Sequence, residues 1–182
     1  MSIVITGNPG VGKHTLANEI SGKLRLSLID INKIASDSKL FEKNQDTNDV
    51  DVTRLEKIIK EKISMPTLIV GHLAPYVIST DKVEKVIVLR RNPYDLILVY
   101  EKRKYTQNKA KENAGSEVLG IIAHDAINRF GKKVFQINVT GKSISEVKER
   151  ILDIIEGNGI NEEVDWLDLV TRNNDLKKFF AY

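Results

Sequence analysis

The stretch SIVITGNPGVGKHT, residues 2–15, places a short apolar run directly before a glycine-rich turn that ends in a lysine. The apolar run is typical of a buried strand, and the segment from Lys13 onward has the pattern of a helix. Glycines between a strand and a helix let backbone N–H groups face a phosphate, while the helix N-terminus and Lys13 add positive charge. The stretch therefore predicts a P-loop that binds a nucleoside triphosphate.

The residue after the lysine departs from the P-loop pattern. A Ser or Thr at this position normally ligates Mg²⁺ through its hydroxyl, whereas this chain has His14 there and Thr15 one place later. We expect Thr15 to contact phosphate or to orient a metal-bound water. His14 either reaches phosphate through its backbone N–H or is an exposed residue without chemistry. The motif predicts phosphate binding and leaves the ligands of a metal ion open.

The composition indicates one enzyme-sized domain without thiol chemistry. The chain has 182 residues, 41% of them hydrophobic, which is close to the usual size of a single domain. Its 28 basic and 25 acidic residues give a net charge of only +3, so we expect no direct DNA binding. The lack of cysteine excludes disulfides, thiolate catalysis and cysteine-bound zinc. The chain starts directly in a strand pattern, and we expect a cytoplasmic protein without a membrane segment.

Short apolar runs alternate with longer amphipathic segments along the chain. This alternation predicts a three-layer α/β fold in which helices cover both faces of a five-stranded parallel sheet. The expected strands are Ile3–Thr6, Leu26–Asp30, Thr67–Gly71, Lys85–Leu89 and Val134–Asn138. The expected helices are Lys13–Leu24, Val52–Ile63, Pro93–Lys104, about Lys109–Phe130 and Ile144–Ile155.

Two polar stretches lie between these elements. Residues Ser36–Val50 are rich in Asn and Asp, and they form either a lobe over a second substrate or an ordinary surface loop. Residues Glu101–Asn113, EKRKYTQNKAKEN, carry an excess of basic side chains. Basic side chains clamp a transferring phosphoryl group, so this stretch predicts a flap with Arg103 as the preferred clamp. The alternative is a solvated helix face.

Histidines and arginines near the expected strand ends are further candidates. His72 follows the third strand, where it either orients a water or the γ-phosphate or packs as a structural residue. Arg90 and Arg91 follow the fourth strand and either reach an acceptor phosphate or pair with a helix carboxylate; the sequence does not choose between them. His124 lies in the middle of a helix pattern and is predicted to be structural.

The tail, about residues 161–182, has an apolar rhythm and contains Trp166, the one tryptophan of the chain. We expect this tail to dock on the sheet domain. The alternative is that its aromatic residues contact a partner, namely Trp166, Phe179, Phe180 and Tyr182.

Several segments together carry a family resemblance. They are GNPGVGKHT (7–15), IVGH (69–72), LRRNP (89–93), RKYTQNKAKEN (103–113) followed by Glu117, and VDW (164–166). Over nearly its whole length the chain resembles the adenylate kinase-like ATPase family implicated in maturation of the small ribosomal subunit, and archaeal members are the best match.

The resemblance implies a single nucleoside monophosphate kinase domain over residues 1–182. It implies transfer of the γ-phosphate of ATP to AMP, with two ADP produced, together with ATPase activity and a small-subunit ribosomal protein as partner. Residues of about 30–53 would be the monophosphate-binding region, and 103–113 the lid. From the motifs described above, we predict Lys13, His72 and Arg103 as the catalytic residues. ATP, with Mg²⁺, would be bound by Gly10, Gly12, Lys13, His14, Thr15 and Lys104.

Two positions depart from this family. His14 replaces the P-loop hydroxyl, and Val70 stands where many members carry an acidic residue two places before the histidine. We therefore expect no dedicated metal ligands, with Mg²⁺ held mainly by phosphates and water or by a carboxylate such as Asp30. This predicts a slow kinase. Two other hypotheses stay open: an ATP-dependent ribosome assembly factor with weak turnover, and a degenerate nucleotide-binding module.

Overall fold

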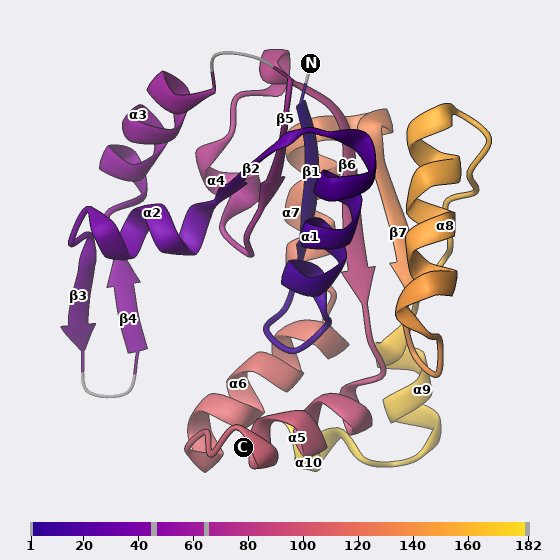
Figure 1. The fold of residues 1–182 in the computed structure, drawn as a ribbon. Helices are drawn as coiled ribbons and strands as arrows, with labels where there is room; N and C mark the ends of the chain where they lie inside the picture. Colours follow the sequence, from indigo (N-terminus) through magenta and orange to yellow (C-terminus); the bar gives the residue numbers. More distant parts are fainter. Residues whose placement is uncertain (1, 45–46, 64–65, 181–182) are drawn as a thin grey trace.

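A five-stranded parallel sheet lies at the centre of the molecule in the computed structural model, which describes residues 2–44, 47–63 and 66–180 (Figure 1). The strand order is β2-β5-β1-β6-β7, and every neighbouring pair is parallel. The strands are β1 (Ser2–Gly7), β2 (Ser27–Asp30), β5 (Thr67–Val70), β6 (Val83–Arg90) and β7 (Val134–Asn138). The predicted α/β fold with five parallel strands is confirmed.

Helices cover both faces of the sheet because its strands are apolar on both sides. In β1, Ile3 and Ile5 belong to one core, whereas Val4 belongs to the other. The first core lies under α1 (Lys13–Leu24) and α8 (Ile144–Glu156). The second lies under α3 (Val52–Lys62), α4 (Ala74–Val77) and α7 (Ile121–Phe130). Short 3-10 turns, Thr80–Lys82 and Gly131–Lys133, precede β6 and β7.

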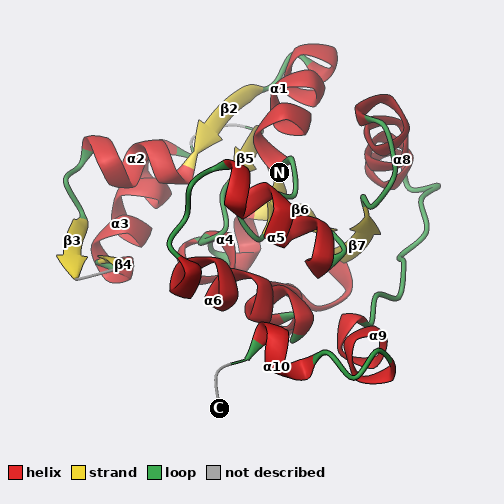
Figure 2. Ribbon diagram, turned by 90° about the horizontal axis from the view of Figure 1, so that it is seen from below, coloured by secondary structure: helices red, strands yellow, loops and turns green. Residues whose placement is uncertain are grey.

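A further group of helices lies beyond the carboxyl ends of the strands (Figure 2). It consists of α5 (Pro93–Lys102), α6 (Gln107–Val118), α9 (Trp166–Arg172) and α10 (Leu176–Phe179). The C-terminal tail docks on the sheet domain at two places: Asn161 and Glu162 hydrogen-bond to the edge strand β7, and α9 and α10 pack on α6. Phe179 is buried and meets the ring of Tyr94 edge-on, with 5.1 Å between ring centroids. Tyr182, expected as a partner contact in the alternative, lies outside the described residues.

The segment between β2 and β5 projects from one side of the sheet (Figure 1). It contains α2 (Ile31–Asp37), an antiparallel hairpin of β3 (Phe41–Asn44) and β4 (Thr47–Val50), and then α3. We call residues 31–62 the α2–α3 lobe. The polar stretch Ser36–Val50 therefore holds regular structure, which its lack of periodicity had not indicated, although residues 45–46 lie outside the description.

The single helix predicted at about Lys109–Phe130 is wrong, because the structure has two helices there. Gly120 adopts φ +64°, a left-handed conformation that favours glycine, and this residue separates α6 from α7. A side chain at Gly120 would also crowd the Arg90 guanidinium, since a Cβ atom would lie 3.3 Å from Nη1.

Within the described ranges, no helix combines the length and the apolar character needed to cross a bilayer.

Candidate functional site

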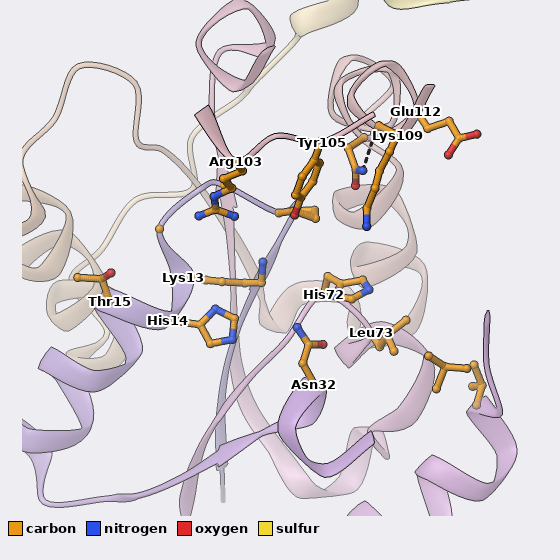
Figure 3. Close-up of a pocket in the computed structure, with 16 residues that line it drawn as sticks. Lys13, His14, Thr15, Asn32, His72, Leu73, Arg103, Tyr105, Lys109 and Glu112 are labelled. Carbon is orange, nitrogen blue, oxygen red and sulfur yellow. Dashed lines mark hydrogen bonds between the residues drawn. The ribbon is translucent and has the colours of Figure 1, made fainter. Parts of the chain in front are cut away.

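A cavity of about 650 Å³ opens at the carboxyl edge of the sheet (Figure 3). Its walls come from the P-loop, the α2–α3 lobe, the residues after β5, and the start of α6 with the turn before it. Of the site residues predicted from the sequence, the cavity brings together Gly10, Gly12, Lys13, His14, Thr15, His72 and Arg103. Residues of the α2–α3 lobe face the same space, namely Asn32, Val50 and Val52.

The P-loop turns sharply from β1 into α1. Gly12 stands at the N-cap of α1 with φ +91°, a conformation that strains any residue with a Cβ atom. Lys13 follows as the first helical residue and is buried, and its Nζ donates to the backbone oxygen of Asn8 at 3.1 Å. Burial, and then the charge of Arg103, lower the pKa of Lys13 to about 8. The charges of Asp30 and Glu117 only partly offset this effect, and bound phosphate oxygens would stabilise the ammonium further.

His14 and Asp30 meet beside this loop. His14 Nε2 lies 3.1 Å from Asp30 Oδ2, and both side chains are partly exposed. The other oxygen of Asp30 caps α2, accepting from the backbone N–H groups of Asn32 at 2.9 Å and Lys33 at 3.2 Å. Asp30 is also the strand partner of Val70 in the β2–β5 register. The structure thus places the carboxylate of Asp30 on the strand next to Val70, the position where many family members carry an acidic residue.

His72 is a neutral group in this cavity at physiological pH. Burial is the main cause that lowers its pKa to about 4, and the nearby charges of Lys13 and His14 lower it further. A neutral imidazole donates and accepts hydrogen bonds but adds no positive charge toward phosphate. His124, by contrast, is exposed on α7 beside Asn128 and does not line the cavity.

The predicted lid, residues 103–113, consists of the turn between α5 and α6 together with the first half of α6. Arg103 is the C-cap of α5 and lines the cavity, as do Tyr105 and Lys109. Tyr105 stacks on Tyr100, whose hydroxyl donates to the backbone oxygen of Pro9 at 2.8 Å. The base of this turn is therefore joined directly to the P-loop.

Lys104 does not take the place that the resemblance implied for it. It is exposed, has a positive φ of 56°, and is absent from the cavity walls. The reversal of the chain between α5 and α6 occurs at this residue. Arg103 before it and Tyr105 after it reach the cavity instead.

A buried carboxylate behind the P-loop joins four parts of the chain. Glu117 of α6 is 1% exposed. Its Oε2 accepts from Asn8 Nδ2 at 2.7 Å, and its Oε1 accepts from Arg90 Nε at 2.8 Å and Trp166 Nε1 at 3.0 Å. The same Oε1 accepts the backbone N–H of Arg91 at 3.1 Å. We call Glu117 and these donors the Glu117 hub.

The hub separates the roles of the two arginines that the sequence could not distinguish. Arg90 is the residue that pairs with a helix carboxylate, and it is buried with its guanidinium against Glu117 and Gln136. Arg91 instead donates from Nη1 to the backbone oxygen of Gly10 at 3.2 Å. Sequence reasoning missed the roles of Asn8 and Glu117. The available signal was that Glu117 falls on the same helix face as the small or apolar residues Ala114 and Val118.

A P-loop after the first strand of a parallel sheet, with a lysine directed into a cavity and basic side chains opposite it, defines a P-loop nucleotide-binding protein. The family model described as "AAA domain" matches residues 3–120. A protein of Methanosarcina barkeri named "Putative adenylate kinase" is 33% identical over 187 residues, covering 93% of this chain and all of that protein. One of Sulfurisphaera tokodaii with the same name is 31% identical, covering 93% and 87%. The chain belongs to the AAA domain family of P-loop proteins, together with these archaeal relatives.

Solved structures share the fold at low sequence identity. The shikimate kinase of Aquifex aeolicus has a TM-score of 0.56 and 15% identity, covering 87% of this chain and 98% of that one. The shikimate kinase of Acinetobacter baumannii in complex with shikimate has a TM-score of 0.58 and 18% identity, covering 88% and 95%. These similarities support the fold.

Proposed function

We propose that the protein is a nucleoside monophosphate kinase that transfers the γ-phosphate of ATP to AMP and releases two ADP. One observation carries this proposal: a single cavity extends from Lys13 of the P-loop to the α2–α3 lobe, with Arg103 on its wall. Such a cavity offers a phosphate site and a second, partly apolar site for an acceptor. The relatives named "Putative adenylate kinase" support a nucleotide as that acceptor.

In this proposal the chain acts by positioning and charge. Phosphoryl transfer needs no protein nucleophile, because a phosphate oxygen of AMP attacks the γ-phosphorus. The P-loop backbone and Lys13 hold the β- and γ-phosphates of ATP, and Thr15 contacts a phosphate from the next helical position. Arg103 faces the same space and neutralises charge that spreads over the transferring group. Neutral His72 orients a phosphate or a water by hydrogen bonding.

The chain lacks the two side chains that normally position Mg²⁺ in P-loop proteins. An imidazole replaces the P-loop hydroxyl, and Val70 replaces a carboxylate. Among the described residues, no three His, Cys, Asp or Glu side chains gather as a metal site. Mg²⁺ would therefore be held mainly by phosphates and water, which this ion tolerates well.

A role in small-ribosomal-subunit maturation is a finer proposal that is supported by the family resemblance of the segments quoted above. It adds ATP hydrolysis and a small-subunit ribosomal protein as partner. In that case the partner should raise ADP and phosphate formation when AMP is absent. A partner that changes neither hydrolysis nor AMP phosphorylation would contradict this role and leave the kinase proposal intact.

The direct test mixes purified protein with ATP and either AMP, CMP, UMP or no acceptor, with Mg²⁺ or Mn²⁺ as the cation, and separates the products by chromatography. We expect ADP formation that depends on AMP and is abolished by Lys13→Ala. The matched control is Lys132→Ala, because Lys132 is exposed at the opposite edge of the sheet. ADP and phosphate without an acceptor would support the ATPase instead. Nucleotide binding without turnover would support a degenerate module.

A further inference from the structure

The contact between His14 and Asp30 has the spacing of two ligands on one metal ion. An octahedral ion with bonds of about 2.1 Å holds adjacent ligand atoms about 3.0 Å apart. His14 Nε2 and Asp30 Oδ2 are 3.1 Å apart. Because Oδ1 of Asp30 is occupied in capping α2, the carboxylate is oriented with Oδ2 toward His14. Both atoms could bind one ion with little rearrangement.

The same two side chains lie where a nucleotide would supply the remaining ligands. His14 directly follows Lys13, and its side chain lines the cavity beside the P-loop (Figure 3). Asp30 ends β2 at the same edge of the sheet. A cation bound with a nucleoside triphosphate usually takes one or two protein ligands, and phosphates and water complete its coordination. Two protein ligands are therefore sufficient for such a site.

A salt bridge alone is a weaker explanation of this pair. The side chains are 46% and 28% exposed, and ion pairs in contact with water contribute little to stability. Lys13 also lies close enough to Asp30 for the two charges to attract each other, so His14 is not the one cationic partner near this carboxylate. A structural role does not account for an imidazole at the position where a P-loop normally has a metal-ligating hydroxyl.

The ligand types also select among metals. Mg²⁺ is a hard ion that prefers oxygen ligands and water, whereas an imidazole suits first-row transition ions. We infer that His14 Nε2 and Asp30 Oδ2 bind the divalent cation that accompanies the nucleotide, and that this site takes Mn²⁺ or Co²⁺ in preference to Mg²⁺. This inference rests on the proposed binding of a nucleoside triphosphate at the P-loop.

The test measures binding rather than turnover. Calorimetry with a non-hydrolysable ATP analogue gives its dissociation constant in the presence of Mg²⁺, Mn²⁺ or Co²⁺. For wild type we expect the Co²⁺ complex to bind about tenfold or more tighter than the Mg²⁺ complex. His14→Thr restores the hydroxyl, and we expect this preference to fall by about tenfold. The visible absorption spectrum of Co²⁺ should also change on binding to wild type, and this change should be lost in His14→Thr.

Two further variants define the site. His124→Thr is the matched control, because His124 is exposed outside the cavity, and its cation preference should equal that of wild type. Asp30→Asn keeps an acceptor for the cap of α2, and it should weaken the Mn²⁺ and Co²⁺ complexes. Nucleotide binding with an unchanged ratio of Mg²⁺ to Co²⁺ affinity in His14→Thr would overturn this inference and leave the kinase proposal standing. A lack of nucleotide binding with every cation would overturn both.

Discussion

Replacing Glu117 by Gln should destabilise the protein strongly, although the change removes almost no volume. Glu117 is 1% exposed, and its ion-pair partner Arg90 is also buried, with a side chain that is 4% exposed. Glutamine keeps the shape and can still accept from Arg90 and Trp166, but it leaves the guanidinium buried without a counter-charge. It also turns an amide N–H₂ group toward Asn8 Nδ2, which is itself a donor.

The expected size follows from these contacts. Breaking a buried ion pair by removing one partner typically costs about 3–5 kcal/mol. Because Gln retains some neutral hydrogen bonds, we expect a loss near the lower limit, about 3 kcal/mol in the free energy of unfolding. Replacing Arg90 by Met in the same chain removes the stranded cation. The double variant should therefore cost less than the sum of the two single variants, with an interaction energy of about 2 kcal/mol.

Denaturant unfolding measures this cost, with circular dichroism as one probe and the emission of Trp166 as another. Trp166 is the one tryptophan of the chain and is itself a member of the Glu117 hub, so its signal reports the unfolding of this region. Glu156→Gln, at an exposed position, is the control and should stay near wild type. A cost below about 1 kcal/mol for Glu117→Gln, or strictly additive single and double variants, would refute the buried-pair argument.

Three other changes test the site. Lys13 has a pKa of about 8 in the free protein, and bound phosphates should raise it. ATP affinity should then stay constant below about pH 8 and fall above it, because Lys13 must take up a proton when ATP binds. Calorimetry in buffers of different ionisation enthalpy measures this proton uptake, and an ATP affinity that does not change with pH would contradict the prediction. His72 has a pKa of about 4, below its unfolded value. The free energy of unfolding should fall by up to about 3 kcal/mol as the pH drops from 6.5 toward 4, because the unfolded chain binds a proton at His72 before the folded protein does. Denaturant unfolding at a series of pH values should show a smaller fall for His72→Asn. Gly12→Ala forces a side chain into φ +91° and should lower the unfolding free energy by about 1–2 kcal/mol; an unchanged melting temperature would argue against strain there.

The sheet and the P-loop could be predicted from the sequence because their signals are local. The strands β1 and β5 are buried along their whole length, so an uninterrupted apolar run marks each of them, and the polar turns at its ends set its length. The P-loop needs adjacent residues only, since Gly12 and Lys13 act through the backbone turn that they form themselves. For the same reason α1 was predicted with its observed bounds.

The remaining features depend on contacts between distant segments. The break at Gly120 accompanies the approach of Arg90 from β6, which helical periodicity alone does not reveal. Glu117 in a polar helix sequence looks like a solvated residue, and only the tertiary fold brings Asn8 and Trp166 to it. Lys104 was placed in the site by its membership in a motif, whereas the left-handed turn at that residue decides which neighbours reach the cavity.

The two positions that depart from the family pattern, His14 and Val70, lie near one carboxylate in the folded sheet. Along the sequence, His14 and Val70 count as two separate losses, and together they motivated the hypothesis of a degenerate module. In the sheet, Asp30 is the direct neighbour of Val70 and lies in contact with His14, so a carboxylate and an imidazole stand together beside the phosphate loop. A decayed site has no reason to bring an imidazole and a carboxylate together while Lys13 stays buried in the wall of the cavity. The rearranged cation site and the degenerate module differ in one outcome. If His14 and Asp30 form a rearranged site, His14→Thr should change which cation supports nucleotide binding. If the site has decayed, His14→Thr should leave the cation preference unchanged.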